Sequence, residues 1–132
     1  MSVIDYSNLQ GSLYYSLSKA ALDQVTHQTA GIFIKYGIRV NSVNPGLVRT
    51  DIIHKMGVPE EYVDPWYDAL TKPEYIPLGR CGVPDDIAQV ILFLADKSKS
   101  EYIVGQCITA DGGSTMRSSM GVAMDKMKET KN

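Results

Sequence analysis

One glycine, Gly37, separates a long helical pattern from a short β-branched one. Residues 13–36 predict a single helix that Ser12 can cap, and a glycine in the left-handed conformation commonly ends such a helix. Residues 38–43 predict a strand, which enters a turn at Asn44-Pro45-Gly46. A helix, a glycine, a strand and a Pro-Gly turn form half of a βαβ unit, and this order predicts an α/β protein.

The rest of the chain continues this pattern. We expect helices at residues 51–56, 60–70 and 84–95, the last of which begins with a Pro-Asp-Asp turn suited to a helix N-terminus. Residues 106–110 predict a short buried strand followed by an Asp-Gly-Gly turn. Residues 47–80 are less regular than their surroundings, and a segment of that kind in a compact domain is often a lid or a binding loop.

Two apolar stripes have two interpretations each. The expected helix at 60–70 carries Tyr62, Trp66, Tyr67 and Leu70 near one face. That stripe either lines a ligand site or is ordinary packing. The tail carries Met116, Met120, Met124 and Met127. If helical, this tail presents a methionine face to a partner or substrate, and otherwise it is a frayed terminus.

The composition excludes several classes of protein. The chain has 132 residues, enough for one domain, with a net charge of −2 and no basic stripe, which argues against a nucleic-acid partner. Cys81 and Cys107 are far apart and predict reduced thiols, and His27 and His54 show no metal-ligand spacing, so no metal site is expected. No long apolar run or leader sequence is present, which predicts a cytoplasmic protein without a membrane partner.

Tyr15 and Lys19 are the first candidates for catalytic residues. They stand four residues apart in the expected helix, so their side chains share one face. A phenol alone gives up its proton near pH ~10, and a neighbouring ammonium favours the charged form, which makes the phenol useful as a general acid or base. A chain with eight tyrosines can also contain such a pair by chance, as an exposed structural pair.

A serine and four short sequence motifs, one of which contains this pair, occur in order along the chain. They are Ser2 thirteen residues before Tyr15; the Tyr-Ser-Leu-Ser-Lys run at 15–19; Asn-Ser-Val-Asn-Pro-Gly at 41–46; Pro-Leu-Gly-Arg at 77–80; and Ile-Thr-Ala-Asp-Gly-Gly at 108–113. Together they resemble the C-terminal half of the short-chain dehydrogenase/reductase family, over residues 2–114. The resemblance implies a doubly wound, Rossmann-like parallel sheet and an NAD(P)-dependent interconversion of a carbonyl and an alcohol. Within the family the chain is similar to small carbonyl, sugar and hydroxysteroid reductases.

The resemblance also implies roles for individual residues. Tyr15 exchanges a proton with the substrate oxygen, Lys19 assists that transfer and holds the nicotinamide ribose, and Ser2 hydrogen-bonds the substrate oxygen. Residues expected along the nicotinamide are Pro45, Gly46, Val48 and Thr50. Residues 51–76 are expected to form the substrate loop, within a domain of residues 1–114 that a methionine-rich tail, 115–132, follows.

A doubly wound nucleotide fold opens with a strand, a glycine-rich turn and a helix that binds the pyrophosphate. No such glycine cluster precedes Tyr15. We therefore expect the chain to lack the phosphate-binding first half, to bind dinucleotide poorly alone, and to leave the choice between NAD and NADP open. The alternative function is a non-catalytic module that forms a homo-oligomer or pairs with a full-length relative.

Overall fold

The computed structural model describes residues 9–116, with side chains from residue 13 onward. These residues form two compact units, which we describe separately. Within the described range, unit 1 comprises residues 9–46 and 84–110, and unit 2 comprises residues 47–83 and 111–116.

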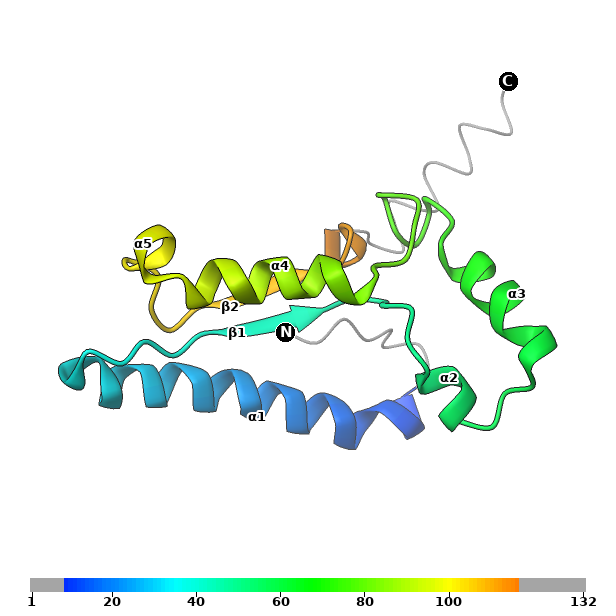
Figure 1. The fold of residues 1–132 in the computed structure, drawn as a ribbon. Helices are drawn as coiled ribbons and strands as arrows, with labels where there is room; N and C mark the ends of the chain where they lie inside the picture. The colour runs from blue at the N-terminus through cyan, green and yellow to red at the C-terminus, as the bar shows by residue number, and fades with distance from the viewer. Residues whose placement is uncertain (1–8, 117–132) are drawn as a thin grey trace, which may run out of the picture. The chain divides into compact units, whose positions relative to one another are not determined.

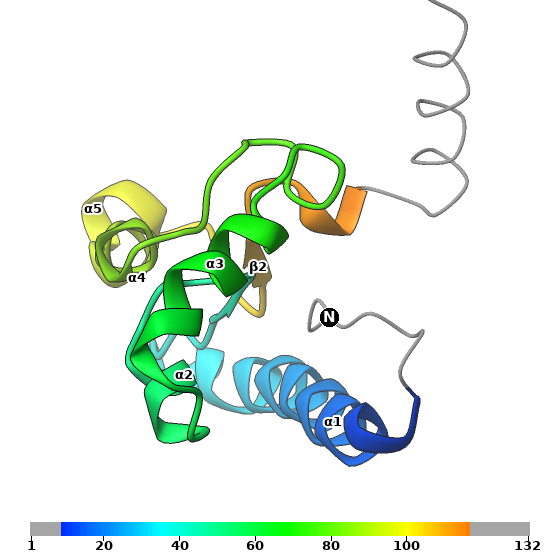
Figure 2. The same cartoon turned by 90° about the vertical axis from the view of Figure 1, so that its right-hand side faces the viewer.

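Unit 1 is a small α/β layer structure. Its elements are α1 (Leu9–Phe33), β1 (Ser42–Pro45), α4 (Pro84–Ala95), α5 (Lys97–Ser100) and β2 (Cys107–Ala110). The two strands pair in parallel, from Ser42 opposite Cys107 to Pro45 opposite Ala110. Helices α1 and α4 lie on opposite faces of this pair in both views (Figures 1 and 2). The prediction of an α/β fold with a parallel sheet is thus confirmed.

Helix α1 begins earlier than predicted, at Leu9 rather than after a cap at Ser12. A glycine such as Gly11 costs a helix about 1 kcal/mol relative to alanine, a cost that a helix of 25 residues can offset. At its other end α1 passes into a 3₁₀ turn, η1 (Ile34–Tyr36). Gly37 then takes the expected left-handed conformation, with φ of 75°, and its N–H donates to the carbonyl of Ile34.

The predicted strand 38–43 is wrong in its bounds, because β1 covers residues 42–45. The segment before Ser42 is connected to the loop preceding β2 by a backbone bond, from the Gly105 N–H to the Val40 carbonyl at 2.8 Å, and by side chains. Asn41 donates from Nδ2 to the Ile103 carbonyl at 3.0 Å and accepts the Gln106 N–H at 2.9 Å. Such contacts depend on residues some sixty positions away, as the separation of 62 between Asn41 and Ile103 shows, so the local pattern could not indicate them.

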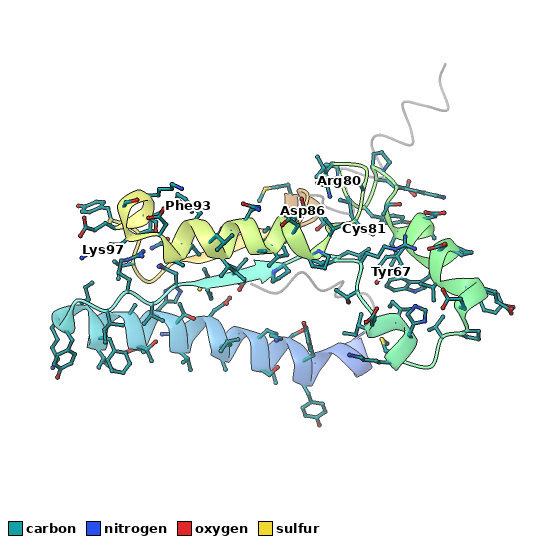
Figure 3. All side chains as sticks on the ribbon, in the orientation of Figure 1. Tyr67, Arg80, Cys81, Asp86, Phe93 and Lys97 are labelled. Atoms are coloured by element: carbon teal, nitrogen blue, oxygen red, sulfur yellow. The ribbon has the colours of Figure 1, made fainter. Side chains whose placement is uncertain are left out.

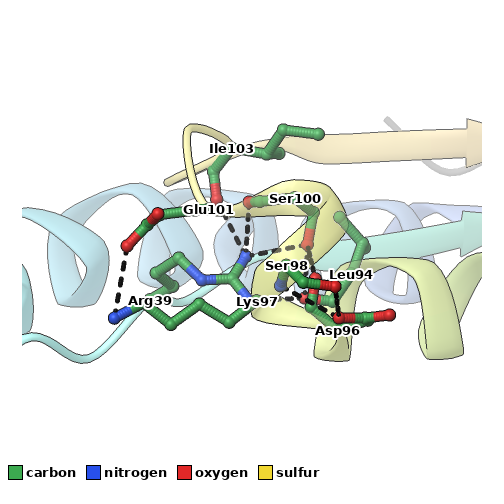
Figure 4. Close-up of polar contacts among 8 residues, drawn as sticks. All are labelled: Arg39, Leu94, Asp96, Lys97, Ser98, Ser100, Glu101 and Ile103. Atoms are coloured by element: carbon green, nitrogen blue, oxygen red, sulfur yellow. Dashed lines mark hydrogen bonds and ion pairs between the residues drawn. The ribbon is translucent and has the colours of Figure 1, made fainter.

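Arg39 binds the loops at the ends of α4 and α5 (Figure 4). Its Nη2 donates to the Leu94 carbonyl at 2.8 Å, and its Nη1 to the Ser100 carbonyl at 2.8 Å and to Ser100 Oγ at 3.2 Å. A longer contact of 3.4 Å reaches the Ile103 carbonyl. Because the last carbonyls of a helix lack intrahelical partners, one guanidinium satisfies acceptors that would otherwise need water.

Unit 2 contains α2 (Ile52–Lys55), α3 (Glu60–Leu70) and the 3₁₀ turn η2 (Ser114–Met116). Its core consists of Ile53, Val63 and Tyr67, with Leu47, Val58 and Cys81 packed against them. The predicted aromatic stripe does not form one buried face. Tyr67 is only 1 % exposed, whereas Tyr62 is 58 % and Trp66 39 % exposed.

The Asp-Gly-Gly turn closes unit 2 with a carboxylate cap. Asp111 accepts hydrogen bonds from the backbone N–H groups of Gly113 and Thr115, at 2.9 and 2.8 Å, and from the hydroxyls of Ser114 and Thr115. Gly112 has φ of +63°, and a Cβ there would lie 2.8 Å from Ile76 Cγ2. Both backbone conformation and space therefore require glycine at this position.

Candidate active site

Tyr15 and Lys19 lie on one face of α1, as their spacing predicts. The Lys19 ammonium nitrogen is 5.3 Å from the centroid of the Tyr15 ring. Tyr15 is 51 % exposed, so its phenol is open to a substrate or solvent, while Lys19 is half-buried. The ammonium lies over the face of the aromatic ring, which is a cation–π contact.

A hydrogen bond ties the same region of α1 to β1. Asn44 donates from Nδ2 to Asp23 Oδ1 at 3.0 Å. Asp23 follows Lys19 by four residues, and Asn44 immediately precedes Pro45. Since α1 and β1 run in opposite directions in Figure 1, the carboxyl end of β1 points toward the half of α1 that carries Tyr15. Ligands of open α/β sheets bind at the carboxyl ends of the strands.

Pro45 and Gly46 form the end of β1. The Gly46 N–H donates to the Ala110 carbonyl at 2.9 Å, which prolongs the pairing with β2 by one step. Pro45 has no N–H and is exposed, and Gly46 has no side chain.

The other two predicted cofactor residues, Val48 and Thr50, lie in unit 2. Val48 forms a parallel bridge with Gly82, and the neighbouring Arg49 N–H donates to the Gly82 carbonyl at 2.8 Å. The Tyr67 hydroxyl lies 3.2 Å from the Thr50 nitrogen and 3.3 Å from the Thr50 carbonyl oxygen, so it can accept from the first and donate to the second. The Thr50 backbone is thus held by α3.

Arg49 strengthens this connection to α3. Its guanidinium forms an ion pair with Asp64 and lies 5.0 Å from the centroid of the Tyr67 ring. Asp64 and Tyr67 are three residues apart on α3, so they share a face. Cys81 packs against the core of unit 2 that contains Tyr67, and both residues are labelled in Figure 3. Burial raises the pKa of the Cys81 thiol.

The structure brings the predicted residues together only in part. Tyr15, Lys19, Pro45 and Gly46 belong to unit 1, and Val48 and Thr50 to unit 2. Ser2 lies outside the described residues. The sequence did not indicate that Asp23 contacts Asn44 or that Tyr67 holds the Thr50 backbone. The helical spacing from Lys19 could have indicated Asp23, whereas nothing local distinguishes Tyr67 from its aromatic neighbours.

In residues 9–116, no three His, Cys, Asp or Glu side chains gather as metal ligands would. Over the same range, no helix combines the length and apolarity needed to cross a membrane.

The family model for enoyl-(acyl carrier protein) reductase matches residues 2–115, most of the chain. A solved short-chain dehydrogenase/reductase from Caenorhabditis elegans, crystallised with cofactor, superposes with a TM-score of 0.80 at 47 % identity, over 83 % of this chain and 41 % of that one. The chain belongs to the short-chain dehydrogenase/reductase family. The resemblance found in the sequence is therefore confirmed.

Other relatives in this family are named oxidoreductases. Galactitol 2-dehydrogenase (L-tagatose-forming) of Cereibacter sphaeroides is 38 % identical over 102 residues, which is 77 % of this chain and 37 % of that protein. The L-sorbose reductase of Gluconobacter frateurii, solved with NADPH and L-sorbose, is 30 % identical with a TM-score of 0.67, over 76 % of this chain and 39 % of that one. The chain thus spans about two fifths of the length of the short-chain dehydrogenases/reductases it matches.

Proposed function

We propose that this chain supplies the proton-transfer half of an NAD(P)-dependent short-chain oxidoreductase. In the reduction direction the Tyr15 hydroxyl donates its proton to the carbonyl oxygen, and in oxidation the phenolate removes one from the alcohol. Lys19 stabilises the phenolate, and Ser2 hydrogen-bonds the substrate oxygen. A bound nicotinamide would supply or accept the hydride. The observation that carries the proposal is the Lys19 ammonium, 5.3 Å from the centroid of an exposed Tyr15 ring.

The cofactor residues we propose are Tyr15, Lys19, Pro45, Gly46, Val48 and Thr50. Pro45 and Gly46 leave the backbone at the end of β1 accessible to the nicotinamide ring. Tyr67 holds the Thr50 backbone, and the exposed Thr50 hydroxyl, which accepts a long bond of 3.4 Å from the Ile52 N–H, can still donate its proton to a carboxamide. NAD and NADP both remain candidates.

The proposed substrate is a small carbonyl compound or the matching alcohol. Residues 51–76 form the proposed substrate loop, in which Tyr62 and Trp66 expose aromatic surface on α3. Aromatic faces of this kind suit the apolar side of a sugar, a steroid or another small alcohol.

A graft tests the proposed chemistry directly. Residues 2–115, which the family model matches, replace the corresponding region of the Cereibacter sphaeroides galactitol 2-dehydrogenase, whose remaining part supplies the rest of a complete enzyme. The graft is assayed with NADH and NADPH on a panel of sugar, steroid and simple carbonyls. We expect turnover that Tyr15→Phe reduces by roughly 10²–10⁴-fold. The 132 residues alone contain no glycine-rich phosphate turn before Tyr15, so we expect no micromolar dinucleotide binding by the isolated chain.

A second candidate function is an interaction module, and the surface of α1 favours it. Five of its apolar side chains are more than half exposed: Leu13, Leu17, Leu22, Val25 and Ile32. A surface of this kind on one helix fits a second copy of the chain or a full-length relative. Light scattering of the purified chain, with Leu22→Glu as the variant, tests it. A stable oligomer that the charge dissociates supports this function, and a monomer in both cases contradicts it.

A further inference from the structure

A cysteine–histidine pair between α1 and β2 has no part in the proposed reaction. Cys107 Sγ lies 3.9 Å from His27 Nε2, and also 3.9 Å from the Asp23 carbonyl oxygen. The thiol is half-buried, whereas His27 is exposed and can exchange its protons with solvent. Both distances are long for hydrogen bonds of a thiol. The Cys107 S–H therefore has two acceptors within reach and a strong hydrogen bond to neither.

The His27 ring is fixed by its other nitrogen. Nδ1 lies 2.8 Å from the Gly105 carbonyl oxygen. A carbonyl can only accept, so Nδ1 is the donor in this contact, and in the neutral form of the ring Nε2, 3.9 Å from Cys107 Sγ, is then the nitrogen with a free lone pair. A nucleophile next to a base that a third group orients is the arrangement that activates thiols in enzymes, and the contact is often long before the reactant arrives.

Ser42 provides an independent observation at the same place. Its Oγ is buried and has no hydrogen-bond partner, although buried hydroxyls nearly always have one. Ser42 is the direct neighbour of Cys107 in the strand register. Alternate residues of a strand share a face, and Asn44 contacts Asp23 on α1, so Ser42 faces α1 as Cys107 does. An oxygen added to the Cys107 sulfur would therefore lie near an unpaired hydroxyl.

We propose that Cys107 is a hydroperoxide-reactive thiol for which His27 is the base and Ser42 stabilises the oxidised product. The thiol passes its proton to His27 Nε2, and the thiolate sulfur forms a bond to the terminal oxygen of the hydroperoxide. The O–O bond breaks, and the leaving alkoxide takes the proton from His27. Sulfur is oxidised by two electrons to a sulfenic acid, and the hydroperoxide is reduced to an alcohol, or to water when the oxidant is hydrogen peroxide.

The second cysteine is an internal control for this reaction. Cys81 is also half-buried, but it packs against the core of unit 2, where burial raises its pKa. The purified chain is treated with hydrogen peroxide, the sulfenic acid is trapped with dimedone, and mass spectrometry measures labelling at each cysteine. We expect Cys107 to be labelled at least fivefold faster than Cys81. Equal rates at the two cysteines would overturn the proposal.

Two variants test the roles of the neighbours. His27→Gln should bring the Cys107 rate down to within about twofold of the Cys81 rate, while His54→Gln, a change in a histidine paired with Glu60, should leave it unchanged. Ser42→Ala should shorten the lifetime of the sulfenic acid without slowing its formation. If His27→Gln loosens the fold, the labelling rate at Cys81 rises as well. The ratio of the Cys107 and Cys81 labelling rates in the wild type and the lifetime of the sulfenic acid in Ser42→Ala then test the proposal. An unchanged ratio in a folded His27→Gln chain contradicts the assigned base.

Discussion

The Tyr67 hydroxyl lies 3.2 Å from the Thr50 nitrogen and 3.3 Å from the Thr50 carbonyl oxygen, and so joins α3 to the proposed cofactor segment. Tyr67→Phe removes only this hydroxyl and retains the ring under Arg49. We expect a loss of about 1 kcal/mol in the free energy of unfolding, the usual net value of a hydrogen bond. Hydrogen exchange at the Thr50 amide should accelerate.

The matched control is Tyr62→Phe on the same helix, where the tyrosine is 58 % exposed. It should change neither the free energy of unfolding nor the exchange at Thr50. If Tyr67→Phe leaves the Thr50 amide as protected as in the wild type, α3 does not hold this backbone segment.

Arg39→Lys tests the guanidinium between α4 and α5. Lysine keeps the charge but cannot donate from two separate nitrogens to the carbonyls of Leu94 and Ser100. Hydrogen bonds from charged groups contribute roughly 1.5–3 kcal/mol each, so we expect a loss of about 2 kcal/mol in urea unfolding. Arg80→Lys, the same change at an exposed arginine, should cost much less. Equal costs for the two variants would show that Arg39 has no special role.

Local signals predicted the bounds of some helices, although α1 begins four residues earlier than expected and α5 was not expected. Helices α3 and α4 have the predicted bounds, 60–70 and 84–95, because the Pro-Asp-Asp start and the breaks after Leu70 and Ala95 are encoded within the elements themselves. Gly37 ends its helical segment in the predicted left-handed conformation for the same reason.

Contacts between distant residues could not be predicted in this way. The position of β1 depends on pairing with a strand 65 residues later and on Asn41 reaching the loop before it. The candidate site divides similarly. The spacing of Tyr15 and Lys19 is a local property, whereas Asp23–Asn44 and Tyr67–Thr50 join different elements. The predicted roles of Ser2 and of the methionine tail beyond Met116 lie outside the described residues.

Asp111 should make the stability of unit 2 depend on pH. Burial by itself raises the pKa of this carboxyl, but hydrogen bonds from Thr115, Gly113 and Ser114 lower it more, so its pKa lies below the usual 3.8. A lowered pKa in the folded state means that the stabilisation is complete above about pH 4 and is lost as the pH falls through the folded value. Urea unfolding between pH 7 and pH 2 measures this dependence.

Asp111→Ala should cost about 1–2 kcal/mol at pH 7, as the loss of a helix cap does, and should remove this part of the acid dependence. Asp51→Ala is the matched control, since Asp51 precedes α2 without a side-chain capping bond. A wild-type chain and an Asp111→Ala chain with parallel pH profiles would refute the assigned cap.

In the proposed reaction Tyr15 transfers the substrate proton with Lys19 beside it, and the graft into galactitol 2-dehydrogenase tests this role most directly. The measurement compares kcat and the cofactor dissociation constant of the graft with those of its Tyr15→Phe variant. We predict a loss of kcat of at least roughly 100-fold, with cofactor affinity within about threefold, because phenylalanine keeps the ring and lacks only the hydroxyl that exchanges the proton. A Tyr15→Phe graft that turns over within about tenfold of the unsubstituted graft, or an unsubstituted graft that binds cofactor but is inactive, would contradict the account.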